Sequence, residues 1–157
     1  MNHGRALALL IERQSKIAAL LQSADALLVV GNPVDRAAMA ALRWQLVRTL
    51  REYQLFKHQE IFDPLVAAGD AGIAHRADGM KDRCVAIGNT YLAHIDSWAN
   101  GATMETWDTY VTQTRGVLAK ITRHLDRERG EATDLLADVG KIRDRTRLAG
   151  SGSVAQG

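Results

Sequence analysis

The chain has 157 residues, enough for one domain with a substantial buried core. Its formal net charge at pH 7 is only +2, with both signs spread along the chain, which argues against the concentrated basic face of a nucleic-acid-binding protein. The single cysteine, Cys84, excludes an internal disulfide and a thiolate metal cluster, and no apolar run reaches the roughly 20 residues that span a bilayer. We therefore expect a cytoplasmic protein in a reducing compartment, without nucleic acid or membrane as a partner.

Four amphipathic helices are predicted, because apolar residues recur along the chain at intervals of three or four. In chain order they cover residues 5–30, 33–66, 73–99 and 103–139. Glycine, asparagine and proline residues between them are typical of helix ends and helix starts. Pro64 lies close to the end of the second helix, where it predicts a local kink or stop.

Four long helices with short connections indicate an all-α fold, an antiparallel up-down-up-down four-helix bundle over residues 1–140. Residues 141–157 are expected to form a basic, flexible C-terminal tail. Every second residue over 141–147 is Lys or Arg, and this run either extends the fourth helix or frays before a glycine- and serine-rich stretch. The sequence leaves open whether the bundle is a monomer or a homodimer.

Two pairs of polar residues interrupt the apolar stripes, Tyr53 with Lys57 in the second predicted helix and His124 with Glu128 in the fourth. Residues four apart lie one turn apart on the same face of a helix, so each pair points to one place on the bundle axis. Helical bundles build metal sites from such pairs on facing helices. From spacing alone, His124 and Glu128 are either half of a metal site or a buried histidine that a carboxylate orients.

The chain resembles the hemerythrin-like (HHE cation-binding) family over nearly its whole folded length. The similarity runs through residues 14–21 (QSKIAALL), 42–46 (LRWQL), 53–62 (YQLFKHQEIF) and 121–136, together with Tyr91 and Trp98. This resemblance implies a hemerythrin-like four-helix bundle. Members of the family hold a non-haem di-iron centre that binds dioxygen or senses oxygen, nitric oxide or iron.

The resemblance places five residues of this chain at the ligand positions of the family. Gln14 stands where a first-helix histidine is expected. In the second helix, Tyr53 stands at the position of a histidine and Lys57 at that of a glutamate. His124 and Glu128 match the positions in the fourth helix.

Two other segments follow the family less closely. Residues 61–64 resemble the end of the second helix with one extra residue. The third helix contains no His-x-x-x-His, and the candidates to face the site there are Met80, Cys84 and Asn89.

These replacements suit a di-iron centre poorly, because two iron ions need several histidines and carboxylates. An ammonium at residue 57 would also repel a dication strongly in a low-dielectric core. Since both family carboxylates point toward the shared centre, the resemblance predicts a buried ion pair between Lys57 and Glu128. Gln14, Tyr53 and His124 would then satisfy the remaining polar groups of a vestigial pocket.

Other residues have simpler interpretations as packing or surface groups. Cys84 is interpreted as a small core residue, with a reactive or redox-sensing thiol as the alternative. His58 is expected to face solvent, and His94 to be a surface or capping group. The three tryptophans are interpreted as packing residues.

The leading hypothesis is a hemerythrin-like bundle that has lost its di-iron site, carries no cofactor, and acts as a non-enzymatic interaction or regulatory module for an unknown protein partner. The alternative is a protein that binds non-haem iron and binds or senses oxygen or nitric oxide through His124, Glu128 and Tyr53, since a tyrosinate can ligate ferric iron. A third interpretation is a polar core pocket that binds a small ligand. The chain has no glycine-rich phosphate loop, no Ser/His/Asp pattern of a catalytic triad and no Cys-x-x-Cys motif. Nothing in the sequence therefore favours a hydrolase or a nucleotide-dependent enzyme.

Overall fold

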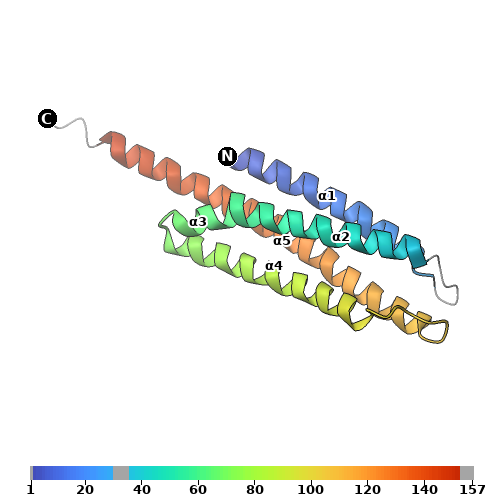
Figure 1. The fold of residues 1–157 in the computed structure, drawn as a ribbon. Coiled ribbons are helices and arrows are strands. Elements are labelled where there is room, and N and C mark those ends of the chain that lie inside the picture. The colour runs from blue at the N-terminus through green and yellow to red at the C-terminus, as the bar shows by residue number, and fades with distance from the viewer. Residues whose placement is uncertain (1, 30–35, 153–157) are drawn as a thin grey trace.

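The computed structural model describes residues 2–29 and 36–152, and these residues form helices without any strand. Four long helices, α1 (His3–Leu27), α2 (Arg36–Lys57), α4 (Ala71–Ser97) and α5 (Trp107–Gly152), lie alongside one another (Figure 1). Helix α1 packs against both α2 and α5, and α4 packs against α5. The expected all-α bundle is thereby confirmed. None of the described helices is long and apolar enough to cross a membrane.

Side-chain caps fix the starts of two helices. The Asn2 side chain accepts a hydrogen bond of 2.8 Å from the backbone N–H of Arg5, and the Asp70 side chain accepts one of 2.9 Å from Ile73. Such caps satisfy N–H groups that have no partner within the helix. Helix α1 ends at Leu27, and the break predicted at residues 31–33 lies outside the described residues.

The second predicted helix does not continue unbroken to residue 66. Helix α2 passes at Lys57 into a short π-helix, η1 (His58–Phe62), which leads into α3 (Asp63–Ala67). The backbone N–H of Asp63 bonds to the carbonyl of His58, five residues back. Pro64 has no N–H and its ring clashes with the carbonyl four residues earlier, which explains why regular α-helix stops here. The kink expected at Pro64 therefore takes the form of a π-helix directly after Lys57.

Helix α5 starts later and ends later than predicted. Thr103 and Thr106 bond to each other through backbone and side chain, which makes a turn before the helix begins at Trp107. The basic run extends the helix, one of the two outcomes that the sequence left open, and residues up to 152 are helical. Residues 143–152 are all exposed, and the red end of α5 projects past α3 in Figure 1. Lys, Arg, Leu and Ala are good helix formers, so this segment extends the helix without core contacts.

The apolar stripes of all four long helices meet in one core. Among the described residues, the buried polar or charged side chains are Gln14, Lys57, Thr114 and Glu128. Trp107 packs inside and donates its indole N–H to the carbonyl of Val29 at 2.8 Å. Trp44, interpreted as a packing residue, is instead 61% exposed, because it lies on the outer face of α2.

Candidate functional site

The five side chains predicted for the pocket lie together in the core. Gln14 of α1 donates its amide N–H to the hydroxyl of Tyr53 and to the carbonyl of Leu125, each at 2.9 Å. The Tyr53 hydroxyl in turn donates a short hydrogen bond to Oε1 of Glu128. These contacts join α1, α2 and α5 through groups that would otherwise be buried without a partner.

The ion pair predicted between Lys57 and Glu128 is present. Nζ of Lys57 lies 2.8 Å from Oε2 and 2.9 Å from Oε1 of Glu128. Lys57 is 1% exposed and Glu128 is 3% exposed, so water does not screen the pair. Nζ also lies 4.1 Å from the centre of the Tyr53 ring, within cation–π distance. The carboxylate thus accepts from Lys57 with both oxygens and from Tyr53 with one.

Cys84 of α4 completes the cluster, and the sequence indicated it only as one of three loose candidates. Its Sγ accepts a hydrogen bond of 2.9 Å from Nζ of Lys57, and the residue is buried. The signal that could have singled it out is its place on the inward stripe of α4, between buried Met80 and Tyr91. Cys84 brings the fourth long helix into contact with the ammonium.

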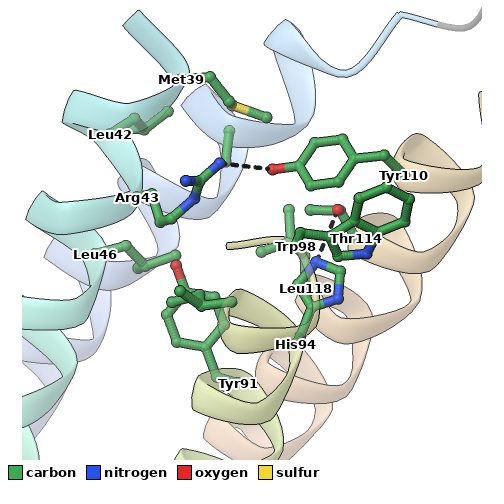
Figure 2. A pocket seen from close by; sticks show the side chains of 12 residues that line it. Met39, Leu42, Arg43, Leu46, Tyr91, His94, Trp98, Tyr110, Thr114 and Leu118 are labelled. Carbon is green, nitrogen blue, oxygen red and sulfur yellow. Dashed lines mark hydrogen bonds between the residues drawn. The ribbon is translucent and has the colours of Figure 1, made fainter. Parts of the chain in front are cut away.

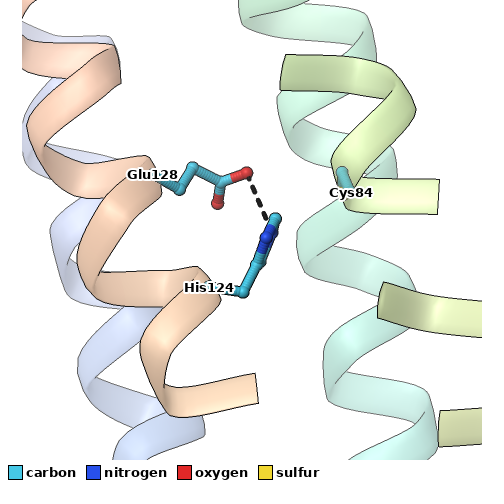
Figure 3. A group of neighbouring side chains, drawn as sticks. All are labelled: Cys84, His124 and Glu128. Carbon is cyan, nitrogen blue, oxygen red and sulfur yellow. Dashed lines mark ion pairs between the residues drawn. The ribbon is translucent and has the colours of Figure 1, made fainter. Parts of the chain in front are cut away.

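His124 lies at the edge of the cluster without a hydrogen bond to it. Its Nε2 is 3.4 Å from Oε2 of Glu128, an ion-pair distance (Figure 3). This nitrogen is buried and makes no hydrogen bond with any described residue. Lys57 and Tyr53 already approach both carboxylate oxygens, which leaves His124 the longer contact. One ligand atom each of Cys84, His124 and Glu128 lie within 4.8 Å of one another.

The protonation of these groups follows from burial and from their mutual contacts. Burial alone would raise the pKa of Glu128, but contacts with His124, Lys57 and Tyr53 outweigh it and lower the pKa to about 2. Burial opposes a charge on His124, yet its proximity to Cys84 and Glu128 raises its pKa to about 9. Burial, and then the Glu128 charge, raise the pKa of Tyr53 far above its usual range. Tyr53 is therefore a neutral phenol that presents no anionic oxygen to a metal.

Gln14 also connects the cluster to the surface. Its Oε1 accepts a hydrogen bond of 3.0 Å from Nε of Arg129, a residue that the sequence analysis did not select. Arg129 borders a groove of about 610 Å³ between α1 and α5. The same groove is lined by Arg115, which pairs with Asp25 at 3.2 Å. The inner end of this groove is Gln14 itself.

A second polar spot lies among aromatic rings where α2, α4 and α5 meet (Figure 2). His94 is partly buried there, with Nε2 2.9 Å from Oγ1 of Thr114 and its ring stacked on Tyr110. Arg43 donates to the Tyr110 hydroxyl at 3.3 Å. The interpretation of His94 as a surface or capping group is therefore wrong. The cavity beside these residues is about 30 Å³, room for about one or two water molecules, and we assign the spot to packing.

His58 also differs from its sequence interpretation. It is only partly exposed, and its ring lies 5.7 Å from that of Phe62 within the π-helix. Its Nε2 is buried and makes no hydrogen bond with a described residue. Burial, and then the charge of Lys57, lower the pKa of His58. The imidazole is accordingly a neutral packing group at the margin of the cluster.

These residues do not fit a di-iron centre. The cluster offers one imidazole, one carboxylate and one sulfur to a metal, whereas two iron ions need several histidines and carboxylates. The Lys57 ammonium contacts both the sulfur and the carboxylate, so a cation already stands between two of the three ligand groups. A dication at the same place would meet strong repulsion.

Comparison with known proteins gives no match of any kind: no family model, no curated protein and no solved structure matches this chain. The hemerythrin-like resemblance thus stays a prediction that rests on the residues. What the site can do chemically follows from its own geometry: an anchored cation, a paired carboxylate, a neutral phenol and a thiol, all within one buried cluster.

Proposed function

We propose that this protein is a hemerythrin-like, antiparallel four-helix bundle without a di-iron site, and that it acts as a non-enzymatic interaction or regulatory module. The position of the Lys57 ammonium is the observation that carries this proposal. Nζ lies within 2.9 Å of both Glu128 oxygens and of Cys84 Sγ, where the resemblance would place metal. The ammonium supplies the positive charge that holds the polar groups of the core together.

The π-helix gives independent support to the resemblance. Relative to the family, residues 61–64 need one extra residue at the end of the second helix, and a π-turn is how an α-helix accommodates a single extra residue. Helix η1 stands at that place, directly after Lys57. A bundle of the family could thus keep its second helix in register while its ligands changed.

An enzymatic role has little support from the cluster. The carboxylate is bound on both oxygens, the phenol is held by Gln14 and Glu128, and the ammonium is buried. A general acid or base must be within hydrogen-bond reach of a substrate proton, but these groups form their hydrogen bonds with one another. The cluster is therefore better suited to hold helices in place than to turn over a substrate.

The alternative function is metal binding through a reduced ligand set, and one observation favours it. Nε2 of His124 is buried and makes no hydrogen bond with a described residue, and one ligand atom each of His124, Cys84 and Glu128 lie within 4.8 Å of one another. The sequence suggested Tyr53 as the third ligand of this set, and the structure adds Cys84 as a further candidate. A sulfur, imidazole and carboxylate set suits Zn²⁺ or Co²⁺ better than a pair of iron ions.

Metal content separates the two functions. We expect wild-type protein, grown with added iron and zinc, to purify colourless and without stoichiometric metal, and to show no thiolate absorption on titration with Co²⁺. In Lys57→Ala, loss of the cation should allow Cys84, His124 and Glu128 to bind Co²⁺ with a thiolate-to-metal absorption band. The double variant Lys57→Ala/Cys84→Ser is the matched control and should lack the band. Stoichiometric iron or zinc in the wild-type protein would overturn the proposal in favour of the alternative.

A further inference from the structure

We propose that Cys84 and Lys57 become joined by a sulfur–nitrogen bond when the protein meets hydrogen peroxide, which makes the core cluster an oxidation-dependent cross-link between α2 and α4. This inference rests on the proposed function, because a metal on Cys84 would occupy the sulfur. It gives the regulatory role a chemical signal.

The first ground is the distance between the two reacting atoms. Nζ of Lys57 lies 2.9 Å from Sγ of Cys84, and both side chains are buried. The chain contains no second cysteine, so an oxidised Cys84 cannot form a disulfide within one molecule. A sulfenic acid in a protein condenses with a nearby thiol or nitrogen, and Lys57 supplies the nitrogen at contact distance.

The second ground is a place for a small oxidant. A cavity of about 30 Å³, comparable to one or two water molecules, is bordered by Lys57, Cys84 and His124. His124 is one of the residues that line this cavity, and its Nε2 is buried and makes no hydrogen bond with a described residue. It can donate to a peroxide oxygen while the sulfur attacks the other oxygen. Hydrogen peroxide is small enough for such a space, whereas a larger oxidant is not.

The third ground is charge. The Lys57 ammonium lies 2.9 Å from Sγ of Cys84, and both side chains are buried. A cation at this place stabilises the negative charge that develops on the departing oxygen as the sulfur attacks peroxide.

The reaction has two balanced steps. In the first, the sulfur of Cys84 attacks hydrogen peroxide: an S–O bond forms, the O–O bond breaks, and the thiol proton leaves with the departing hydroxide as water. The sulfur is oxidised by two electrons and the peroxide is reduced by two. In the second, Lys57 loses one proton to solvent and its amine attacks the sulfur. An N–S bond forms, the S–O bond breaks, and a second nitrogen proton leaves with the hydroxide as water.

The test is treatment of folded, full-length, metal-free protein with a stoichiometric amount of hydrogen peroxide, followed by thiol titration and tryptic mass spectrometry. We expect the Cys84 thiol to be lost and dithiothreitol to restore it. We also expect Lys57 and Cys84 in one cross-linked peptide, lighter than the sum of its parts by two hydrogen atoms and uncut by trypsin after Lys57. A sulfinic acid without a cross-link, or a link that retains oxygen, would overturn the proposal.

Two controls keep the result interpretable. Lys57→Arg keeps the positive charge, but its guanidinium is a poor nucleophile, so peroxide should leave a sulfenic acid that dimedone traps or a sulfinic acid that dithiothreitol does not reverse. Wild-type protein unfolded in urea should likewise give no Lys57–Cys84 peptide, and this control does not depend on a variant that folds. Equal cross-linking in folded and unfolded protein would contradict the role of the geometry. Metal-free protein that fails to cross-link overturns this inference alone, whereas metal-loaded protein overturns the proposed function.

Discussion

Lys57 is the residue whose change should have the largest effect, because one buried ammonium contacts groups from three helices. It bonds Cys84 of α4 and Glu128 of α5, and it lies over the ring of Tyr53 in its own helix. A buried ion pair adds little net stability compared with an apolar pair of similar size, but a single remaining partner is an uncompensated buried charge. Removing Lys57 or Glu128 alone should therefore cost more stability than the ion pair between them adds.

Lys57→Met should lower the free energy of unfolding by about 3–5 kcal/mol, because it leaves the Glu128 carboxylate buried without its cation. The double variant Lys57→Met/Glu128→Leu should recover most of this loss. Urea unfolding followed by circular dichroism measures both. Lys81→Met, which removes an exposed ion pair with Asp63, is the matched control and should change little. Equal urea midpoints for the single and the double variant would show that Lys57 and Glu128 are not energetically coupled.

The pH dependence of stability should report on Glu128 and His124 in opposite directions. Glu128 has a folded-state pKa of about 2 against an ordinary value of 4.5, so its contribution is present above pH 4.5 and is lost as pH falls toward 2. The folded-state pKa of His124 is about 9 against an ordinary 6.5. Its contribution is therefore complete below pH 6.5 and is lost as pH rises through 9.

His124→Gln should accordingly remove the decline in stability between pH 6.5 and 9 and reduce the acid limb, because His124 is the first of the contacts that lower the pKa of Glu128. The wild-type protein is the parent in this comparison, because contact with Cys84 is one of the causes of the raised pKa of His124. Thermal midpoints across this pH range provide the measurement. The assignment fails if the alkaline slope of the variant matches that of its parent.

Among the helices, α5 combines two parts with different roles. Up to Val139 it contributes buried side chains to the core, whereas residues 143–152 are exposed throughout. Three arginines and Leu148, which is 72% exposed, lie in this projecting part. Basic residues on an exposed helix suit contact with an acidic partner. The core part holds the cluster, and the projecting part is available for interaction.

Removal of residues 143–157 should therefore shift the thermal midpoint by no more than about 2 °C, because residues 143–152, the described part of this segment, include no buried side chain. Truncation after residue 134 is the contrasting variant. It deletes buried Leu135, Leu136 and Val139 and should prevent cooperative unfolding. Differential scanning calorimetry distinguishes the two. A large loss of stability in the shorter deletion would mean that the projecting end packs on the bundle.

Sequence periodicity predicted the elements far better than their ends. The four stripes were clear because residues such as Leu46 and Ile121 recur at helical spacing and are buried. The length of α5 was missed because its apolar stripe fades after Val139 while helix-forming residues continue. The π-helix was missed because a bond between residues five apart leaves no apolar pattern; Pro64 and the extra residue at 61–64 indicated a disturbance but not its form.

Within the site, the resemblance predicted the pairing of Lys57 with Glu128, but other contacts had no signal in the sequence. Arg129 of α5 donates a hydrogen bond to Gln14 of the neighbouring helix α1. Such a contact depends on how far α5 is rotated about its own axis. The rotations of α2 and α4 about their own axes likewise place Trp44 outside and His94 inside, which residue type alone did not indicate. Residue type predicts the chemistry that a position can supply, whereas packing decides which neighbours receive it.

At the scale of the whole molecule, one cluster touches all four long helices. Gln14 belongs to α1, Tyr53 and Lys57 to α2, Cys84 to α4, and His124 and Glu128 to α5. A change in any of them therefore acts on every helix pair at once, and unfolding should be cooperative. The same arrangement would let a modification at Cys84 reach the surface groove through Gln14 and Arg129.

The hydrogen bonds from that groove to the core all run in one direction. Arg129 donates to Gln14, Gln14 donates to Tyr53, and Tyr53 donates to Glu128. An arginine has no acceptor and an amide cannot exchange its oxygen for its nitrogen, so this row cannot reverse its polarity. A proton wire needs reversal after each transfer. This row of hydrogen bonds therefore cannot conduct protons from the groove to Glu128. It can still polarise Glu128, because each donor strengthens the next hydrogen bond.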